Sequence, residues 1–160
     1  MTADLQVDLT EARATEDLGR AIAAHLRAGD LVVLTGDLGA GKTTLTRGIG
    51  AGLGVRGPVT SPTFVIARHH PTEVEGPELL HVDAYRLSSP AEVDDLDLDI
   101  EQAVAVIEWG SGVVEHLSDS RLDIRMDAVG DGRRAHITFY GPRWDPAAIA
   151  RLAASLPAPA

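Results

Sequence analysis

The chain has 160 residues, which is enough for one domain with its own core and leaves little for a second. Hydrophobic residues make up 44% and charged residues 24%, a globular composition that excludes a disordered or membrane-embedded class of protein. The sequence has no cysteine, which excludes disulfide scaffolds, thiolate metal sites and cysteine nucleophiles. We expect one domain over residues 1–156 and a disordered tail over residues 157–160.

The net charge of −10 is concentrated in one part of the chain. Between residues 71 and 101 acidic side chains predominate, and Arg86 is the one Lys or Arg of that stretch. Because proteins that bind nucleic acid directly neutralise phosphates with clustered Lys and Arg, such binding is not expected to be the main property. The acids of residues 94–101 form either a solvated surface or a docking surface for a basic partner. Without a signal peptide pattern or a long apolar run, the sequence predicts a cytoplasmic protein with no membrane partner.

The first half of the chain predicts two strands and two helices. Residues 5–9 alternate like a half-buried strand, and Leu18, Ile22 and Leu26 give the following segment one apolar face. We expect that helix to start at residues 10–11 and to end by Gly29. A continuous apolar run over residues 31–34 indicates a strand buried on both faces, and residues 42–53 predict a second helix.

The second half predicts more strands than helices. Apolar runs indicate strands over residues 64–69, 79–83 and 104–108, with a short helix near Pro90. Residues 122–126 and 135–139 alternate on either side of a glycine turn, which predicts an antiparallel hairpin, and residues 146–156 predict a terminal helix. The expected fold class is α/β, with a mostly parallel sheet flanked by helices and a C-terminal antiparallel hairpin.

A glycine-rich loop between a predicted strand and a predicted helix carries the clearest chemistry. It fits the pattern G-x-x-x-x-G-K-[ST] at every fixed position. In such a P-loop the backbone N–H groups surround a phosphate, Lys42 reaches the β and γ phosphates, and the Thr43 hydroxyl ligates Mg²⁺. The predicted nucleotide-binding residues of the loop are Gly36, Asp37, Leu38, Gly39, Ala40, Gly41, Lys42, Thr43 and Thr44.

Two carboxylates end predicted strands, and hydrolysis needs an acid to hold the metal or position water. Asp83 and Glu108 should project toward Mg²⁺ and the γ-phosphate, because the carboxyl ends of parallel strands gather at the nucleotide crevice. The spacing leaves open which of them ligates the metal. Thr60, Ser61 and Thr63 either sense the γ-phosphate or shape a turn.

Two further residues near these acids have more than one interpretation. His81 is interpreted as a core or supporting residue rather than as part of a metal cluster with residues 69–70, because cysteine and a helical H-x-x-x-H spacing are both missing. Trp109 either packs by the nucleotide or lies in the core.

Four segments occur together in an order and spacing that resembles the bacterial TsaE family. They are residues 36–44 (GDLGAGKTT), 61–64 (SPTF), 81–87 (HVDAYRL) and 107–109 (IEW). The resemblance implies a P-loop ATPase that uses ATP and Mg²⁺ and acts with the TsaD and TsaB proteins. Those proteins place a threonylcarbamoyl group on adenosine at tRNA position 37, so the chain would contact tRNA mainly through them. ATP hydrolysis would support turnover of the complex.

The resemblance also implies roles for single residues. Lys42 and Thr43 would hold phosphates and Mg²⁺, and Asp83 and Glu108 would be the essential acids. Thr63 would be switch-like. Thr10 and Thr15 would lie near the base. Two features depart from the family's usual pattern: histidines stand at residues 69–70 where a tyrosine is common, and Gly110 follows the tryptophan where a proline often does.

Three other functions are weighed against this one. A P-loop GTPase is disfavoured because its N-K-x-D element cannot exist in a chain with no asparagine. A small-molecule kinase would need an Arg-rich lid, whereas the region after the P-loop is acidic. A nucleotide sensor would keep Lys42 and hydrolyse ATP negligibly.

Overall fold

The computed structural model describes residues 3–37, 39–59 and 67–156. The predicted tail over residues 157–160 lies outside these ranges. Twelve elements follow one another along the described chain: β1 (Ala3–Leu9), α1 (Ala12–Ala23), β2 (Leu31–Gly36), α2 (Lys42–Leu53), β3 (Ala67–His70), β4 (Glu78–Asp83), α3 (Pro90–Asp94), β5 (Ala103–Glu108), the 3₁₀ helix η1 (Glu115–Leu117), β6 (Arg121–Val129), β7 (Gly132–Tyr140) and α4 (Pro146–Ser155).

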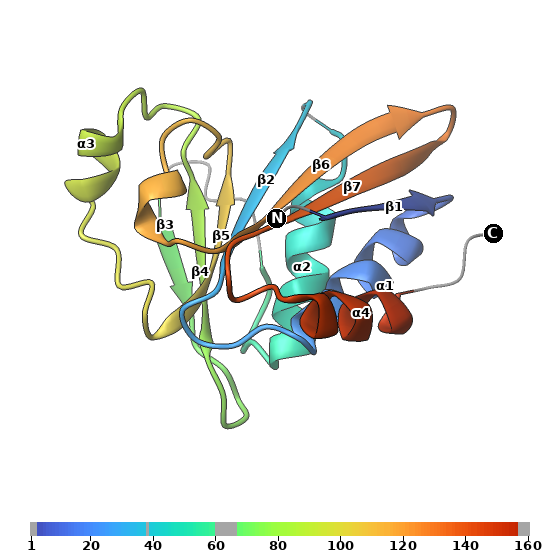
Figure 1. Ribbon diagram of the computed structural model, residues 1–160, viewed down its shortest axis with the longest axis horizontal. Helices are drawn as coiled ribbons and strands as arrows, with labels where there is room; N and C mark the ends of the chain where they lie inside the picture. The colour runs from blue at the N-terminus through green and yellow to red at the C-terminus, as the bar shows by residue number, and fades with distance from the viewer. Residues whose placement is uncertain (1–2, 38, 60–66, 157–160) are drawn as a thin grey trace.

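The described strands form one sheet in the order β1-β7-β6-β2-β5-β4-β3 (Figure 1). Its centre is parallel, since β2 pairs parallel with both β5 and β6, and β4 pairs parallel with β5. The outer pairs are antiparallel: β1 with β7, β6 with β7, and β3 with β4. The expected α/β class with a parallel centre and a C-terminal hairpin is therefore confirmed.

Helices cover one face of the sheet, and shorter elements cover the other. Along β2, Val32 and Leu34 belong to the apolar cluster that includes residues of α1, α2 and α4. Leu31 and Val33 belong to a second cluster, formed with α3 and the segments around η1. Both sets of side chains are almost fully buried, as the continuous apolar run predicted for a strand covered on both faces.

Several elements differ in length from their predictions: the hairpin strands β6 and β7 are longer and helix α1 is shorter, while β3 can be compared only from residue 67 on. Helix α1 ends at Ala23 and does not continue toward Gly29, because the N–H groups of His25 and Leu26 bond to carbonyls three residues back and tighten the chain into turns. Leu26 nevertheless remains in the core. Strand β3 begins at Ala67, and residues 64–66 of the predicted strand lie outside the described part of the chain.

Helices α1 and α2 pack very closely, and a glycine allows this. A Cβ atom on Gly48 would overlap the carbonyl oxygen of Glu16 in α1. Only glycine lets the two backbones approach to this distance. This close packing holds α2 against α1. It thereby also positions the loop that precedes α2.

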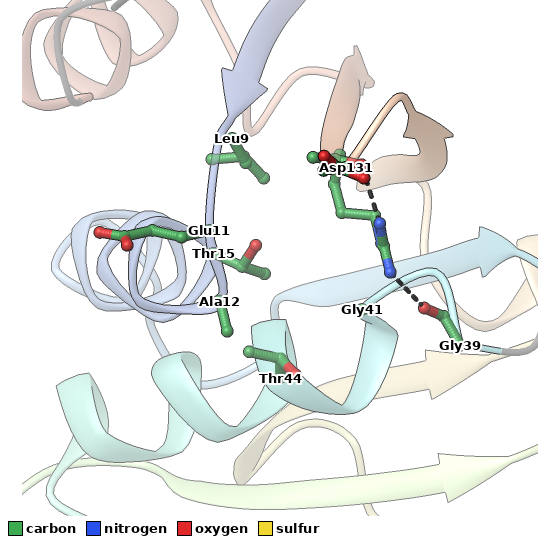
Figure 2. Close-up of a pocket in the computed structure, with 10 residues that line it drawn as sticks. Leu9, Glu11, Ala12, Thr15, Gly39, Gly41, Thr44 and Asp131 are labelled. Atoms are coloured by element: carbon green, nitrogen blue, oxygen red, sulfur yellow. Dashed lines mark hydrogen bonds between the residues drawn. The ribbon is translucent and has the colours of Figure 1, made fainter.

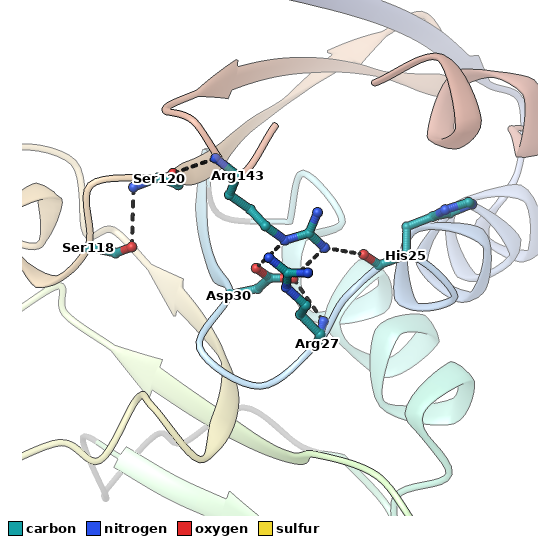
Figure 3. A network of polar contacts seen from close by, with 6 residues as sticks. All are labelled: His25, Arg27, Asp30, Ser118, Ser120 and Arg143. Atoms are coloured by element: carbon teal, nitrogen blue, oxygen red, sulfur yellow. Dashed lines mark hydrogen bonds and ion pairs between the residues drawn. The ribbon is translucent and has the colours of Figure 1, made fainter. Parts of the chain in front are cut away.

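A polar network closes the end of the sheet where β2 begins (Figure 3). The Arg143 guanidinium, in the loop before α4, donates from Nε to Oδ1 of Asp30 at 3.0 Å and from Nη2 to Oδ2 at 3.1 Å. It also donates to the carbonyl oxygen of His25 at 2.8 Å. Asp30 is only 6% exposed, so this ion pair joins the C-terminal region to the start of the central strand inside the protein.

Within the described ranges, no helix is long and apolar enough to cross a membrane.

Candidate nucleotide-binding site

The glycine-rich loop joins the carboxyl end of β2 to the amino end of α2, as the motif predicted. Gly36 has a φ of 146°, and a Cβ atom there would overlap the carbonyl oxygen of Met126 on β6. The turn therefore requires glycine at this position. Helix α2 begins at Lys42, so its first N–H groups, which have no partner within the helix, open toward the loop.

Lys42 lies inside the loop and is only 6% exposed. Its ammonium Nζ donates to the carbonyl oxygens of Gly36 at 2.5 Å and Asp37 at 3.2 Å. The same nitrogen lies 4.1 Å from the centroid of the Trp109 ring, a cation–π contact. Burial lowers the pKa of Lys42, and the negative charges of Glu108, Asp37 and Asp83 oppose this shift.

A depression with a cavity volume of about 390 Å³ lies over the loop. This volume is within the usual range for pockets that bind small molecules. Lys42 is the one basic side chain among the described residues that line it, so a negatively charged group would meet its cation there. The described lining is Gly39, Gly41, Lys42, Thr43, Thr44, Asp83, Glu108 and Trp109, all of them residues that the sequence predicted for the site.

The two predicted acids lie side by side at the carboxyl edge of the sheet. Asp83 ends β4, Glu108 ends β5, and the two residues are direct neighbours in the parallel register. Glu108 is buried, and its Oε2 lies 2.6 Å from Nε2 of His81. Asp83 is half-buried, and its Oδ1 accepts a hydrogen bond from the N–H of Tyr85 at 2.9 Å.

The oxygen atoms of these acids and of Thr43 suit a magnesium ion. Mg²⁺ prefers oxygen ligands and is usually held by one or two carboxylates together with phosphate oxygens. In the described part of the chain, no three His, Cys, Asp or Glu side chains cluster as an all-protein metal cage. The donor set thus fits an ion that completes its coordination with a bound polyphosphate.

Trp109 lies at the site rather than in the core. Its φ of 62° is unusual for a residue other than glycine. Its backbone N–H donates to the carbonyl oxygen of Leu34 at 2.9 Å. The ring covers the Lys42 ammonium on one side and meets the exposed ring of Tyr85 edge to face at 5.5 Å. Of the two interpretations that the sequence left open, the structure favours packing at the site.

A second pocket lies on the other side of the loop, between α1 and the β6–β7 hairpin (Figure 2). Thr15 is buried at its wall, whereas Thr10 is exposed and does not belong to the described lining. That these two residues lie near the base of a nucleotide stays a prediction. Arg133 reaches across from β7, and its Nη2 donates to the carbonyl oxygen of Gly39 at 3.1 Å. The described lining is Leu9, Glu11, Ala12, Thr15, Gly39, Gly41, Thr44, Asp131, Gly132 and Arg133.

Sequence reasoning missed Arg133 and the neighbouring Asp131. Arg133 and Gly39 are 94 positions apart, and no periodicity or motif of the chain links the hairpin tip to the P-loop. The glycine turn between β6 and β7 was the one available signal. It indicated a hairpin, but it did not indicate that the tip of this hairpin contacts the P-loop.

The remaining predicted residues either do not line the depression or lie outside the described part of the chain. The side chain of Asp37 is exposed and Ala40 is buried, so these two contribute to the loop through their backbone. Leu38 lies outside the described residues. So do Thr60, Ser61 and Thr63, and the switch-like role remains a prediction.

Comparisons with known proteins identify the family of this chain. The family model described as "Threonylcarbamoyl adenosine biosynthesis protein TsaE" matches residues 9–136. A Streptomyces coelicolor protein named "tRNA threonylcarbamoyladenosine biosynthesis protein TsaE" is 59% identical over 145 residues, which cover 86% of this chain and 98% of that protein. A Bacillus subtilis protein of the same name is 41% identical over 128 residues, 78% of each chain.

The likeness extends to the three-dimensional structure. The crystal structure of YdiB from Bacillus subtilis superposes with a TM-score of 0.77 at 31% sequence identity, covering 96% of this chain and 97% of that one. With the family model spanning most of the chain and the relatives matching over most of their length, the chain belongs to the TsaE family of threonylcarbamoyl adenosine biosynthesis proteins.

Proposed function

We propose that this protein is a magnesium-dependent ATPase that supports the threonylcarbamoyltransferase machinery of tRNA modification. The observation that carries the proposal is the convergence of Lys42, Thr43, Asp83 and Glu108 on one depression over the P-loop. The depression combines a buried cation for phosphates, a hydroxyl and carboxylates for a magnesium ion, and a helix N-terminus.

The two pockets suggest how ATP would lie. They share Gly39, Gly41 and Thr44, so a single ligand can occupy both by passing over the loop. The triphosphate would lie in the depression beside Lys42, and the nucleoside would lie in the pocket formed by Thr15 and Arg133. Selectivity for adenine over guanine would depend on that second pocket, because the chain has no N-K-x-D element.

Each residue of the depression has a distinct part in the proposed hydrolysis. Lys42 leaves the loop carbonyls for the β and γ phosphates and stabilises the negative charge that develops there. Glu108 and Asp83 orient the attacking water and support the metal from the edge of the sheet. Magnesium, when bound with Thr43 and an acid, would neutralise part of the phosphate charge. Water then attacks the γ-phosphorus, the bond to the ADP oxygen breaks, and phosphate leaves.

Hydrolysis by the isolated chain should be slow. An arginine that contacts the transferred phosphoryl group typically contributes on the order of 10³ to 10⁵ in rate, and among described residues the depression contains no arginine. Arg86 is exposed three positions beyond Asp83 and is one possible source. A partner protein is the other, which would make ATP turnover depend on docking.

The proposed partners are the TsaD and TsaB proteins. Membership in the TsaE family and the names of the relatives support this assignment. The charge of the chain supports protein partners over direct tRNA binding, because 24 acidic residues outnumber 14 basic ones and no basic cluster is evident in the sequence. The chain would contact tRNA mainly through this complex.

Phosphate release from Mg-ATP tests the proposal. The protein would be assayed alone and with TsaD and TsaB from the same source, next to Lys42→Ala and the control Arg47→Ala. Arg47 is an exposed cation on the same helix, so its loss changes the charge of α2 without touching the depression. We expect stimulation by the partners in the wild type and Arg47→Ala, and neither ATP binding nor release in Lys42→Ala.

Two other results would contradict the proposal. ATP binding without any phosphate release, even with both partners, would favour a sensor or a kinase that awaits its acceptor. Unchanged ATP affinity in Lys42→Ala would remove the P-loop from the binding site.

A further inference from the structure

His81 is a polar side chain in an apolar place. It lies in the middle of β4 with no exposed surface, and the neighbouring residues Leu79, Leu80 and Val82 are buried apolar side chains. Burying an imidazole without a partner is unfavourable, so a residue of this kind needs a compensating contact. In the described part of the chain its one hydrogen bond is the 2.6 Å contact from Nε2 to Oε2 of Glu108, and its Nδ1 has no partner.

We propose that His81 is a positioning residue that holds the Glu108 carboxylate in the orientation needed for ATP hydrolysis. This inference rests on the proposed function. The imidazole does not line the depression and would not touch ATP or the metal. It acts on the reaction only through the carboxylate that it holds.

The direction of the hydrogen bond follows from the chemistry of the pair. An ionised carboxylate can only accept, so Nε2 of His81 carries the proton and donates it toward Oε2. This bond occupies one oxygen of Glu108 from the interior of the sheet. No further hydrogen bond joins the carboxylate to another described residue, so its second oxygen is left for the depression that Glu108 lines.

The register shows why a long side chain is needed at this position. His81 is paired with Val106 on β5, whereas the neighbour of Glu108 on β4 is Asp83. His81 therefore reaches Glu108 diagonally across the two strands, on one face of the sheet. A small or purely apolar side chain there would leave Oε2 without a donor.

Lys42 is the competing partner that makes this restraint necessary. Among the carboxylates near the ammonium, Glu108 exerts the largest electrostatic effect on Lys42, yet the described structure shows no ion pair between them. A Glu108 free to turn would form that ion pair, and both side chains would then be withdrawn from the nucleotide. The hydrogen bond to His81 holds Oε2 of Glu108 in place. Glu108 therefore stays near Lys42 without forming an ion pair with it.

The test compares His81→Leu, which removes the donor, with His81→Gln, whose amide N–H can replace it. The control is His70→Leu, a buried histidine on the adjacent strand whose ring centroid lies 6.5 Å from that of His81 and which forms no hydrogen bond with Glu108 among the described residues. We expect His81→Leu to lower kcat for partner-stimulated phosphate release by about 10- to 100-fold with little change in KM for ATP, the range found for residues that orient catalytic groups. His81→Gln should recover most of kcat, and His70→Leu should keep it.

Thermal unfolding of all variants separates positioning from damage to the fold. An unchanged kcat in His81→Leu would overturn the proposal, as would equal losses of kcat in His81→Leu and His70→Leu. Equal losses of kcat in His81→Gln and His81→Leu would overturn it too.

A second measurement keeps the inference distinguishable from the proposed function. If the wild type releases no phosphate, the proposed function fails, and the imidazole nitrogen spectrum of His81 still decides whether the bond exists. We expect its Nε2–H signal to shift in Glu108→Gln and to remain in place in Asp95→Asn, whose carboxylate is exposed on the acidic segment. An Nε2 signal insensitive to Glu108→Gln would overturn the inference.

Discussion

Glu108 and Asp83 differ in their surroundings although they end neighbouring strands. Glu108 is buried and held by His81, while Asp83 is half-buried and caps the N–H of Tyr85. Replacing either acid by its amide keeps the shape and removes the charge, so the fold and ATP binding should persist. We expect Glu108→Gln and Asp83→Asn each to lower phosphate release on the order of 10²-fold or more, the usual contribution of a positioned acid or base.

Steady-state phosphate release with partners present checks this prediction, and Asp95→Asn controls for loss of an exposed negative charge. Full turnover in one of the two amide variants would show that this acid takes no part in the reaction. Full turnover in both would remove the pair from the mechanism.

His70 gives the fold a sensitivity to acid. Burial lowers the pKa of His70, and the nearby His81, Arg68 and His69 lower it further. Below pH 6.5 the His70 imidazole is protonated in the unfolded chain but stays neutral in the folded chain until the pH reaches the lowered pKa. The free energy of unfolding therefore falls as the pH drops from 6.5 toward that lowered pKa. We expect urea unfolding to show a larger loss of stability between pH 7.5 and 5.5 in the wild type than in His70→Leu. Equal losses would contradict the prediction.

At the scale of elements, the crossing of α1 and α2 depends on Gly48. A Cβ atom there meets the backbone of Glu16, which cannot rotate away as a side chain could. Although alanine favours a helix more than glycine does, we expect Gly48→Ala to lower the free energy of unfolding by about 1–3 kcal/mol through overpacking. Urea unfolding beside Ala51→Ser, on the exposed face of the same helix, measures the difference. A more stable Gly48→Ala would show that the helices can separate at no cost.

The individual elements were more predictable than their lengths. Helix α2 begins at Lys42 and ends at Leu53 as expected, because the P-loop and a following glycine mark both ends. Helix α1 was predicted too long, since Leu26 continues the apolar spacing although the backbone has already turned. The spacing of apolar residues indicates which side chains are buried. A buried residue in a turn, such as Leu26, can continue that spacing just as a helical residue does.

At the scale of the whole molecule, the sequence could place the P-loop and both acids in one site but could not give the sheet order. The position of strand ends follows from the parallel α/β rule, which brought Asp83 and Glu108 to one edge. The pairing of β1 with β7 joins the first and the last of the described strands. Alternating residues show that a strand has a buried face, but they do not show which strand lies beside it. The contact of Arg133 with Gly39 depends on the pairing of β6 with β2, which the sequence could not give either.

The Arg143–Asp30 ion pair offers the last prediction, because it stabilises the molecule far from the reaction. Asp30 directly precedes β2, and the P-loop directly follows β2. The Arg143–Asp30 ion pair and the nucleotide site therefore lie at opposite ends of this central strand. Arg143→Met leaves a carboxylate buried without its cation, which should lower the free energy of unfolding by about 3–5 kcal/mol. Asp30→Asn combined with Arg143→Met should recover part of that loss, since the uncompensated charge is gone.

The exposed pair Arg125–Asp127 is the control, and Arg125→Met should change stability by less than about 1 kcal/mol. Urea unfolding measures all three, and ATP affinity should match the wild type wherever the variants are folded. Equal effects of Arg143→Met and Arg125→Met would mean that the buried pair contributes no more than a surface one, and weakened ATP binding in folded Arg143→Met would mean that the two ends of β2 are coupled.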